Sequence, residues 1–246
     1  MNPSGHSLFI STPISVIIKE ANKACMSLGT GIEIHPLAAY IMQTTFLRLT
    51  GASEQKLKCF CWEVASFDYE FRYEMLRSPL GECSSIQDKS MIFKSIWQSL
   101  KRYDVHIEFS DAEKNRIITM ATTELLLELQ ASPLAAIFDK EYLEFKQYIN
   151  SKPIKKTLFC NYNGKNLSFL EEVLQDYYKE CVYKMRNRYA HNLTSYQLNV
   201  PTLSQLAKND SYKSNHFRMI SNLILIDGIF MTLFDKFKDL RSFHSY

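Results

Sequence analysis

The sequence predicts an all-α protein, folded as a helical bundle of eight helices. Apolar residues recur three and four positions apart in most segments between the glycine and proline breaks, which is the spacing of one helix face. Serine and threonine stand where helices would begin, and their hydroxyls can cap free backbone N–H groups there. The clearest alternating stretch, Val105 to Phe109, has five residues and is too short to indicate a sheet.

Four of these helices are expected in the first 105 residues. Thr12 followed by Pro13 is typical of a helix start, and Gly51 is expected to end the second helix before Ser53 caps the third. Pro79 and its neighbours then break the chain. These helices are expected at about 12–28, 37–49, 53–77 and 88–103.

Four more helices are expected in the rest of the chain. Ser110 with Glu113, and Ser168 with Glu171, have the spacing of a capping box, so each pair predicts a helix start. Ser132 before a proline predicts another. These helices are expected at about 110–131, 134–150, 168–197 and 214–240, with a loop at 152–164.

The predicted helices divide the chain into two regions. Residues 106–246 are expected to form an up-and-down four-helix bundle. Residues 1–105 form a helical N-terminal region, which either packs on the same core or makes a small lobe of its own. The sequence shows no internal repeat and no low-complexity linker between them.

The totals favour a globular protein of the cytoplasm. Hydrophobic residues are 46% of the 246 and aromatic residues 13%, which is ample for a packed core. The net charge of +3 is mild, so any basic surface must be local. Six cysteines without a CxxC pair fit free thiols in a reducing compartment. No basic segment precedes Leu8, and Asp227 and Gly228 interrupt the apolar run 223–234, so no signal peptide or membrane span is expected.

Several kinds of chemistry have no counterpart in the sequence. With 7 glycines there is no glycine-rich phosphate loop, and the six histidines are scattered. Cys59 and Cys61 are more readily explained as two small buried residues than as half of a zinc site. We therefore expect no cofactor and no metal.

One stretch brings catalytic residue types together, the segment that contains Arg186, Asn187 and His191. Histidine can remove the proton of a ribose 2′-OH or protonate the leaving oxygen near neutral pH, and arginine can brace a phosphate with its fork of donors. Asn187 lies one helical turn before His191 and can orient the ring or donate to a phosphate oxygen. These are the groups that a metal-free ribonuclease needs. The spacing alone is weak, and by itself it favours a solvated helix face with no chemistry.

The residues around the motif extend this hypothesis to RNA binding. Lys184 and Arg188 supply positive charge, and Tyr189 supplies a ring on which a base could stack. The alternative is that the tyrosine belongs to the core. Five residues turn an ideal helix by about 140°, so Arg186 and His191 do not share a face unless the long arginine side chain wraps around the helix or the helix distorts. A second copy of the chain could also solve this by bringing two motif helices together in a shared groove.

The run Arg186, Asn187, three residues and His191 resembles the signature of the HEPN (higher eukaryote and prokaryote nucleotide-binding) superfamily, and the likeness covers about 110–246. It implies an all-α bundle with a four-helix core, a homodimer whose motif helices face each other, and metal-independent cleavage of single-stranded RNA. Such proteins are toxins, abortive-infection effectors and other antiphage defence nucleases. Leu193 stands where members paired with nucleotidyltransferase antitoxins have tyrosine, so that pairing is not expected. Residues 1–105 carry no motif of the family.

Two functional hypotheses follow. The first is a homodimeric endoribonuclease, with Arg186, Asn187 and His191 as catalytic residues and with RNA and an antitoxin or defence-system protein as partners. The second is a helical interaction or sensor module without catalysis. Neither hypothesis involves a membrane.

Overall fold

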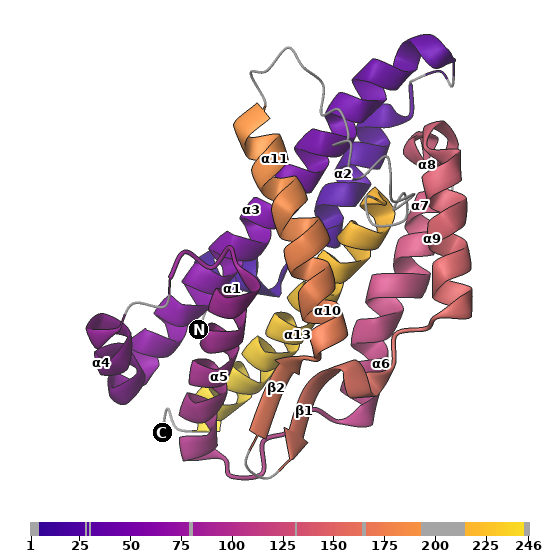
Figure 1. Cartoon of the computed structure of the whole chain (residues 1–246). Coiled ribbons are helices and arrows are strands. Elements are labelled where there is room, and N and C mark those ends of the chain that lie inside the picture. Colours follow the sequence, from indigo (N-terminus) through magenta and orange to yellow (C-terminus); the bar gives the residue numbers. More distant parts are fainter. Residues whose placement is uncertain are drawn as a thin grey trace.

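Helices form most of the chain, as predicted (Figure 1). The structure is a computed structural model that describes residues 5–27, 29, 31–78, 81–130, 132–163, 166–192 and 215–243. Within these ranges the one sheet is a two-stranded hairpin. The protein is therefore an all-α helical bundle, and the predicted fold class is confirmed.

The elements of residues 1–105 are all helical. They are α1 (Gly5–Ser11), α2 (Ser15–Cys25), the short 3-10 helix η1 (Ile32–Ile34), α3 (His35–Phe67), α4 (Tyr69–Arg77) and α5 (Ile86–Tyr103). Several boundaries differ from the prediction. Asp68 caps α4, so the helix predicted at 53–77 is broken there. Thr12 donates its hydroxyl to the carbonyl of Leu8 and so ends α1 rather than starting α2. The helix predicted to stop at Gly51 continues through it, because buried residues on both sides of the glycine hold α3 in the core and outweigh a propensity cost of about 1 kcal/mol.

Helices and two paired strands make up the described part of residues 106–246. They are α6 (Asp111–Thr119), the π-helix η2 (Met120–Glu124), α7 (Leu125–Gln130), α8 (Pro133–Ile137), α9 (Asp139–Ser151), the 3-10 helix η3 (Lys156–Leu158), β1 (Phe159–Asn163), β2 (Asn166–Leu170), α10 (Glu172–Tyr177), the π-helix η4 (Tyr178–Tyr183), α11 (Lys184–Asn192) and α13 (His216–Phe243). The capping box of Ser110 with Glu113 is confirmed, and Ser132 caps α8 as predicted.

The second predicted capping box, Ser168 with Glu171, is wrong. Ser168 lies in β2 opposite Asn161 of β1, and the helix begins at Glu172 instead. The reason is burial: Phe169 is 1% exposed, and its ring centroid lies 5.0 Å from that of Phe93 on α5. Packing of this ring against α5 outweighs the local Ser-x-x-Glu pattern.

A single hydrophobic core takes residues from both predicted regions, from Ile10 to Phe237. Its centre is α13, which packs against α3, α5, α6 and α9 and runs through the middle of the bundle in Figure 1. The N-terminal region therefore packs on the same core. By length and composition α13 could cross a membrane, but 94% of its most apolar window is buried inside this fold.

Candidate functional site

The predicted catalytic residues lie on α11, whose two sides differ in exposure. Tyr189 is buried, whereas Lys184 and His191 are exposed and Asn187 is half-buried. Lys184, Asn187 and His191 are spaced three and four residues apart, so they form one stripe along the helix. The outward stripe of α11, defined by these three residues, is the surface on which the proposed chemistry depends.

A groove of about 570 Å³ opens beside this stripe. One wall is the start of α5, with Ser85, Ile86 and Gln87. The other wall comes from η4 and α11. Its residues are Lys179, Tyr183, Lys184, Asn187 and Arg188. We call this cavity the α5–α11 groove. Three predicted site residues, Lys184, Asn187 and Arg188, thus line one cavity, and His191 follows Asn187 by one helical turn.

The α5 wall of the groove is held in place by buried side chains. The ammonium of Lys89, 0% exposed, donates to the carbonyl of Cys83, and the hydroxyl of Tyr178 donates to the next carbonyl, that of Ser84, at 2.9 Å. The backbone at Cys83 turns with a φ of 64°. These bonds fix the loop immediately before Ser85, which caps α5. The wall is a rigid part of the fold.

Arg186 points toward α3 and also contacts Asn187 of the outward stripe. Its Nη2 lies 3.3 Å from Oε2 of Glu54, and its Nη1 donates to Oδ1 of Asn187 at 3.1 Å. The Arg186 side chain is 31% exposed and that of Glu54 16%. Burial lowers the pKa of Lys89 to about 8, and the charge of Glu54 opposes this shift. One carboxylate therefore serves two cations, Arg186 and the buried Lys89.

Tyr189 does not fit the RNA contact predicted for it. The residue is 5% exposed, and its hydroxyl lies 2.5 Å from Nε2 of His216 on α13. Nδ1 of His216 lies 3.0 Å from a carboxylate oxygen of Glu141 on α9. Burial raises the pKa of Tyr189, so the phenol stays protonated and can donate to the imidazole. Tyr189 is an anchor that ties α11 to α13 and α9, and its ring is not available to a base.

The described residues offer little to a metal ion. Among them, no group of three or more histidine, cysteine or acidic side chains is placed to hold one. Cys59 and Cys61 are both buried, as the sequence interpretation expects, and burial raises the pKa of the Cys61 thiol to about 12.

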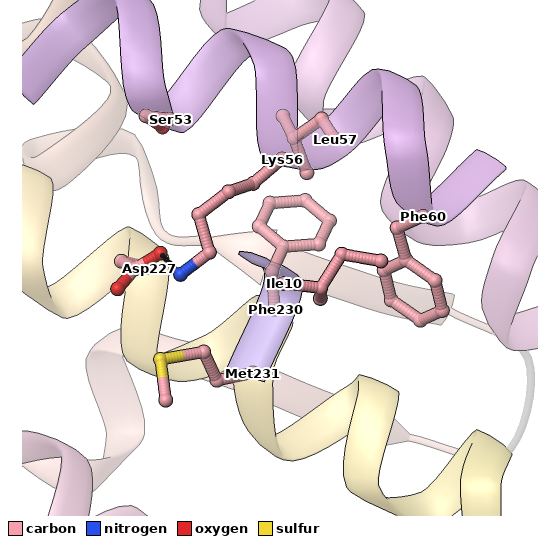
Figure 2. Close-up of a pocket in the computed structure, with 8 residues that line it drawn as sticks. All are labelled: Ile10, Ser53, Lys56, Leu57, Phe60, Asp227, Phe230 and Met231. Carbon is pink, nitrogen blue, oxygen red and sulfur yellow. Dashed lines mark hydrogen bonds and ion pairs between the residues drawn. The ribbon is translucent and has the colours of Figure 1, made fainter. Parts of the chain in front are cut away.

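A second, much smaller cavity lies inside the bundle around an ion pair (Figure 2). Nζ of Lys56 lies 2.5 Å from Oδ1 of Asp227 and donates to the carbonyl of Thr12 at 2.8 Å. The other carboxylate oxygen accepts the backbone N–H of Ile14 at 3.0 Å. The cavity, about 10 Å³, has room for about one water molecule. These groups satisfy one another, and the cavity is too small for a substrate.

The residues that the sequence interpretation missed come from distant segments. Glu54 lies 132 positions before Arg186, Ser85 caps α5 and Gln87 lies in its first turn. No local pattern marks them.

Comparisons with protein-family models, curated proteins and solved structures found no match for this chain. The functional argument therefore rests on the geometry of α11 and its groove.

Proposed function

We propose that the protein is a metal-independent endoribonuclease that cleaves single-stranded RNA, with two copies of α11 completing the active site. The observation that carries the proposal is the outward stripe of α11. It presents Asn187 and the exposed His191 beside a groove lined by three cationic side chains. A proton-transfer group next to a phosphate-binding surface is the minimum that metal-free RNA cleavage requires.

Each motif residue has a role in this reaction. His191 removes the 2′-OH proton, and the 2′ oxygen attacks the adjacent phosphorus while the bond to the 5′ oxygen breaks. Arg186 neutralises the charge that develops on the phosphate oxygens. Asn187 donates a hydrogen bond to the phosphate. A second histidine, from the other copy, protonates the leaving oxygen.

The direction of Arg186 supports the proposed dimer. Its guanidinium is held on the α3 side of the helix, about 140° from His191 on an ideal α-helix. A second α11 laid against the first would bring the arginine of one copy to the histidine of the other. Release of Arg186 from Glu54 is then part of substrate binding. In a cell we expect a cytoplasmic toxin or antiphage effector that is restrained by a partner protein.

The second candidate is a non-catalytic interaction module. It is favoured by the ion pair of Arg186 with Glu54, which occupies the arginine, and by the burial of Tyr189. In this case the exposed stripe of α11 would bind a protein and not RNA. The two candidates differ in whether the purified protein cuts RNA.

The test is cleavage of a mixed single-stranded RNA and of total tRNA with EDTA present. We expect the wild-type protein to cut, and His191→Ala and Arg186→Ala to lose at least 100-fold in rate. His106→Ala and Arg77→Ala change exposed residues away from α11 and serve as matched controls. Unchanged thermal melting shows that the variants fold. Equal cleavage by wild type and His191→Ala rejects the proposal.

A further inference from the structure

The α5–α11 groove has the size and lining of a site for a small charged molecule. Its volume of about 570 Å³ lies within the range of pockets that bind small ligands. Lys179, Lys184 and Arg188 give it positive charge, and Tyr183 gives it an aromatic ring. Cations next to an aromatic surface are the combination that binds a phosphate and a base together.

The charge of the groove is only partly neutralised by the protein. Lys184 forms an ion pair with Glu180 one turn earlier. Among the described residues, neither Lys179 nor Arg188 forms an ion pair with a carboxylate. Asp88 lies at the start of α5, but its carboxylate accepts the backbone N–H of Ser85 in the capping box. The groove therefore keeps at least two cations for an anionic ligand.

Tyr183 is fixed in a way that suits a stacking platform. The residue is half-buried, packs against the hydrophobic core and also lines the groove. It belongs to the π-helix η4, a rare geometry that occurs often at functional sites. Within η4, Tyr178 is buried against the α5 wall while Lys179 and Tyr183 reach the groove. The wide turn thus supplies support for one wall and contacts for a ligand on the other.

We infer that the α5–α11 groove is a nucleotide subsite, which binds the nucleotide next to the cleaved bond with its base on Tyr183 and its phosphate on Lys179 and Arg188. The inference deepens the proposed function and rests on it for the identity of the substrate. From Asn187 in the groove to His191 is four residues, about 6 Å along the helix axis. A strand seated in the groove therefore leads directly to the catalytic histidine.

The experiment measures binding without cleavage. Fluorescence anisotropy with a labelled single-stranded hexaribonucleotide, and competition by inorganic polyphosphate, are recorded on full-length protein that carries His191→Ala. Adding Tyr183→Leu is expected to weaken RNA binding about tenfold and to leave polyphosphate binding unchanged, because only a base can stack. Adding Lys179→Ala and Arg188→Ala is expected to weaken the binding of both RNA and polyphosphate. It should also reduce the slope of log K for RNA binding against log salt concentration by about 1.4. Tyr69→Leu and Lys140→Ala, on exposed residues of other helices, are the controls.

Tyr183 packs on the core, so Tyr183→Leu could weaken folding, and a second variant is therefore placed on an exposed residue. Gln87→Glu puts a carboxylate on the exposed rim of the groove, in the first turn of α5 where an acidic residue suits the helix dipole. It is expected to weaken RNA binding several-fold. If Tyr183→Leu folds and binds RNA like its parent, or if Gln87→Glu has no effect, the subsite is rejected even when the wild type cuts RNA. If the wild type does not cut but the binding pattern holds, the ribonuclease proposal fails and the nucleotide site stands.

Discussion

Glu54 and Lys56 lie two residues apart on α3, and each forms an ion pair with a different helix. Two residues turn a helix by about 200°, so the side chains point to opposite sides. Lys56 pairs with Asp227 of α13 at 2.5 Å, with side chains 6% and 4% exposed. Glu54 pairs with Arg186 of α11 at 3.3 Å, with 16% and 31% exposed. The first pair is closed to water and the second is open to it.

The difference in burial gives the two pairs different functions. Removal of one partner from a buried pair leaves an uncompensated charge in the core and costs about 3–5 kcal/mol. An ion pair in contact with water contributes about 0–1 kcal/mol, because water and other ions replace each partner at little cost. We therefore expect the Lys56–Asp227 pair to stabilise the fold, and under the proposed function a phosphate of RNA would displace Glu54 from Arg186.

The largest effect is expected at the buried pair. Asp227→Ala leaves Lys56 charged in the core, and we expect the free energy of unfolding to fall by about 3–5 kcal/mol, measured by urea denaturation. Burial lowers the pKa of Lys56 and raises that of Asp227, which shows that both charges are costly there. The double variant Lys56→Met with Asp227→Leu is expected to recover most of the loss. Asp239→Ala, on an exposed acidic residue of the same helix, is the control. A loss below 1 kcal/mol would mean that the buried pair contributes no more to stability than the Arg186–Glu54 pair.

The next effect concerns Lys89, the second cation near Glu54. Its pKa of about 8 in the folded protein is below the value near 10.4 of an unfolded chain. Between these values the unfolded chain binds more protons, so the free energy of unfolding contributed by Lys89 rises with pH, by about 3 kcal/mol in total. This gain is expected in the wild type relative to Lys89→Met, measured by urea denaturation from pH 7 to 10. Lys94→Met, at an exposed position of the same helix, should keep the wild-type pH profile. If the difference in free energy of unfolding between wild type and Lys89→Met does not change with pH, the prediction is contradicted.

Tyr189 tests whether α11 itself is anchored by a buried contact. Tyr189→Phe removes only the hydroxyl that contacts His216. We expect the free energy of unfolding, measured by urea denaturation, to fall by about 1 kcal/mol. Tyr40→Phe, on a ring that is 61% exposed, should be neutral. An unchanged stability in Tyr189→Phe would mean that packing against Phe46, and not the hydrogen bond, anchors the helix.

The smallest effect on stability is expected at Glu54, together with a gain in RNA binding. Glu54→Gln frees Arg186 and also removes the negative charge that favours the buried Lys89 ammonium. We expect the free energy of unfolding to fall by up to about 1 kcal/mol and RNA affinity to rise several-fold, measured by anisotropy in the His191→Ala background. Glu74→Gln, on an exposed residue of α4, is the control. Weaker binding in Glu54→Gln would show instead that Glu54 positions the arginine for RNA.

The parts of the fold that sequence reasoning predicted are those decided by neighbours along the chain. The capping box at Ser110 and the cap at Ser132 need only local hydrogen bonds. The errors lie where tertiary packing decides which secondary structure a segment adopts. Gly51 is spanned by a helix because α3 is held in the core, and Ser168 lies in a strand because Phe169 packs on α5. Local patterns carry no information on such contacts.

The candidate site divides in the same way. Lys184, Asn187 and Arg188 could be grouped from the sequence because one helix carries them all. Glu54 and the α5 wall could not be found, because the fold brings them to α11 from more than 90 positions away. The burial of Tyr189 was left open by the sequence, since a tyrosine in a helix suits both a core and a surface.

The π-helix η4 has a consequence for how this protein could have arisen. A π turn holds one residue more than an α turn, so η4 is equivalent to an ordinary helix with a single inserted residue. Removing that residue would leave α10 and α11 in register and keep Arg186, Asn187 and His191. It would also change the turn that carries Lys179 and Tyr183, both of which line the groove. The proposed catalytic motif and the part of the groove that η4 supplies could thus change separately through one codon, and a lineage could gain or lose the proposed nucleotide subsite while keeping Arg186, Asn187 and His191.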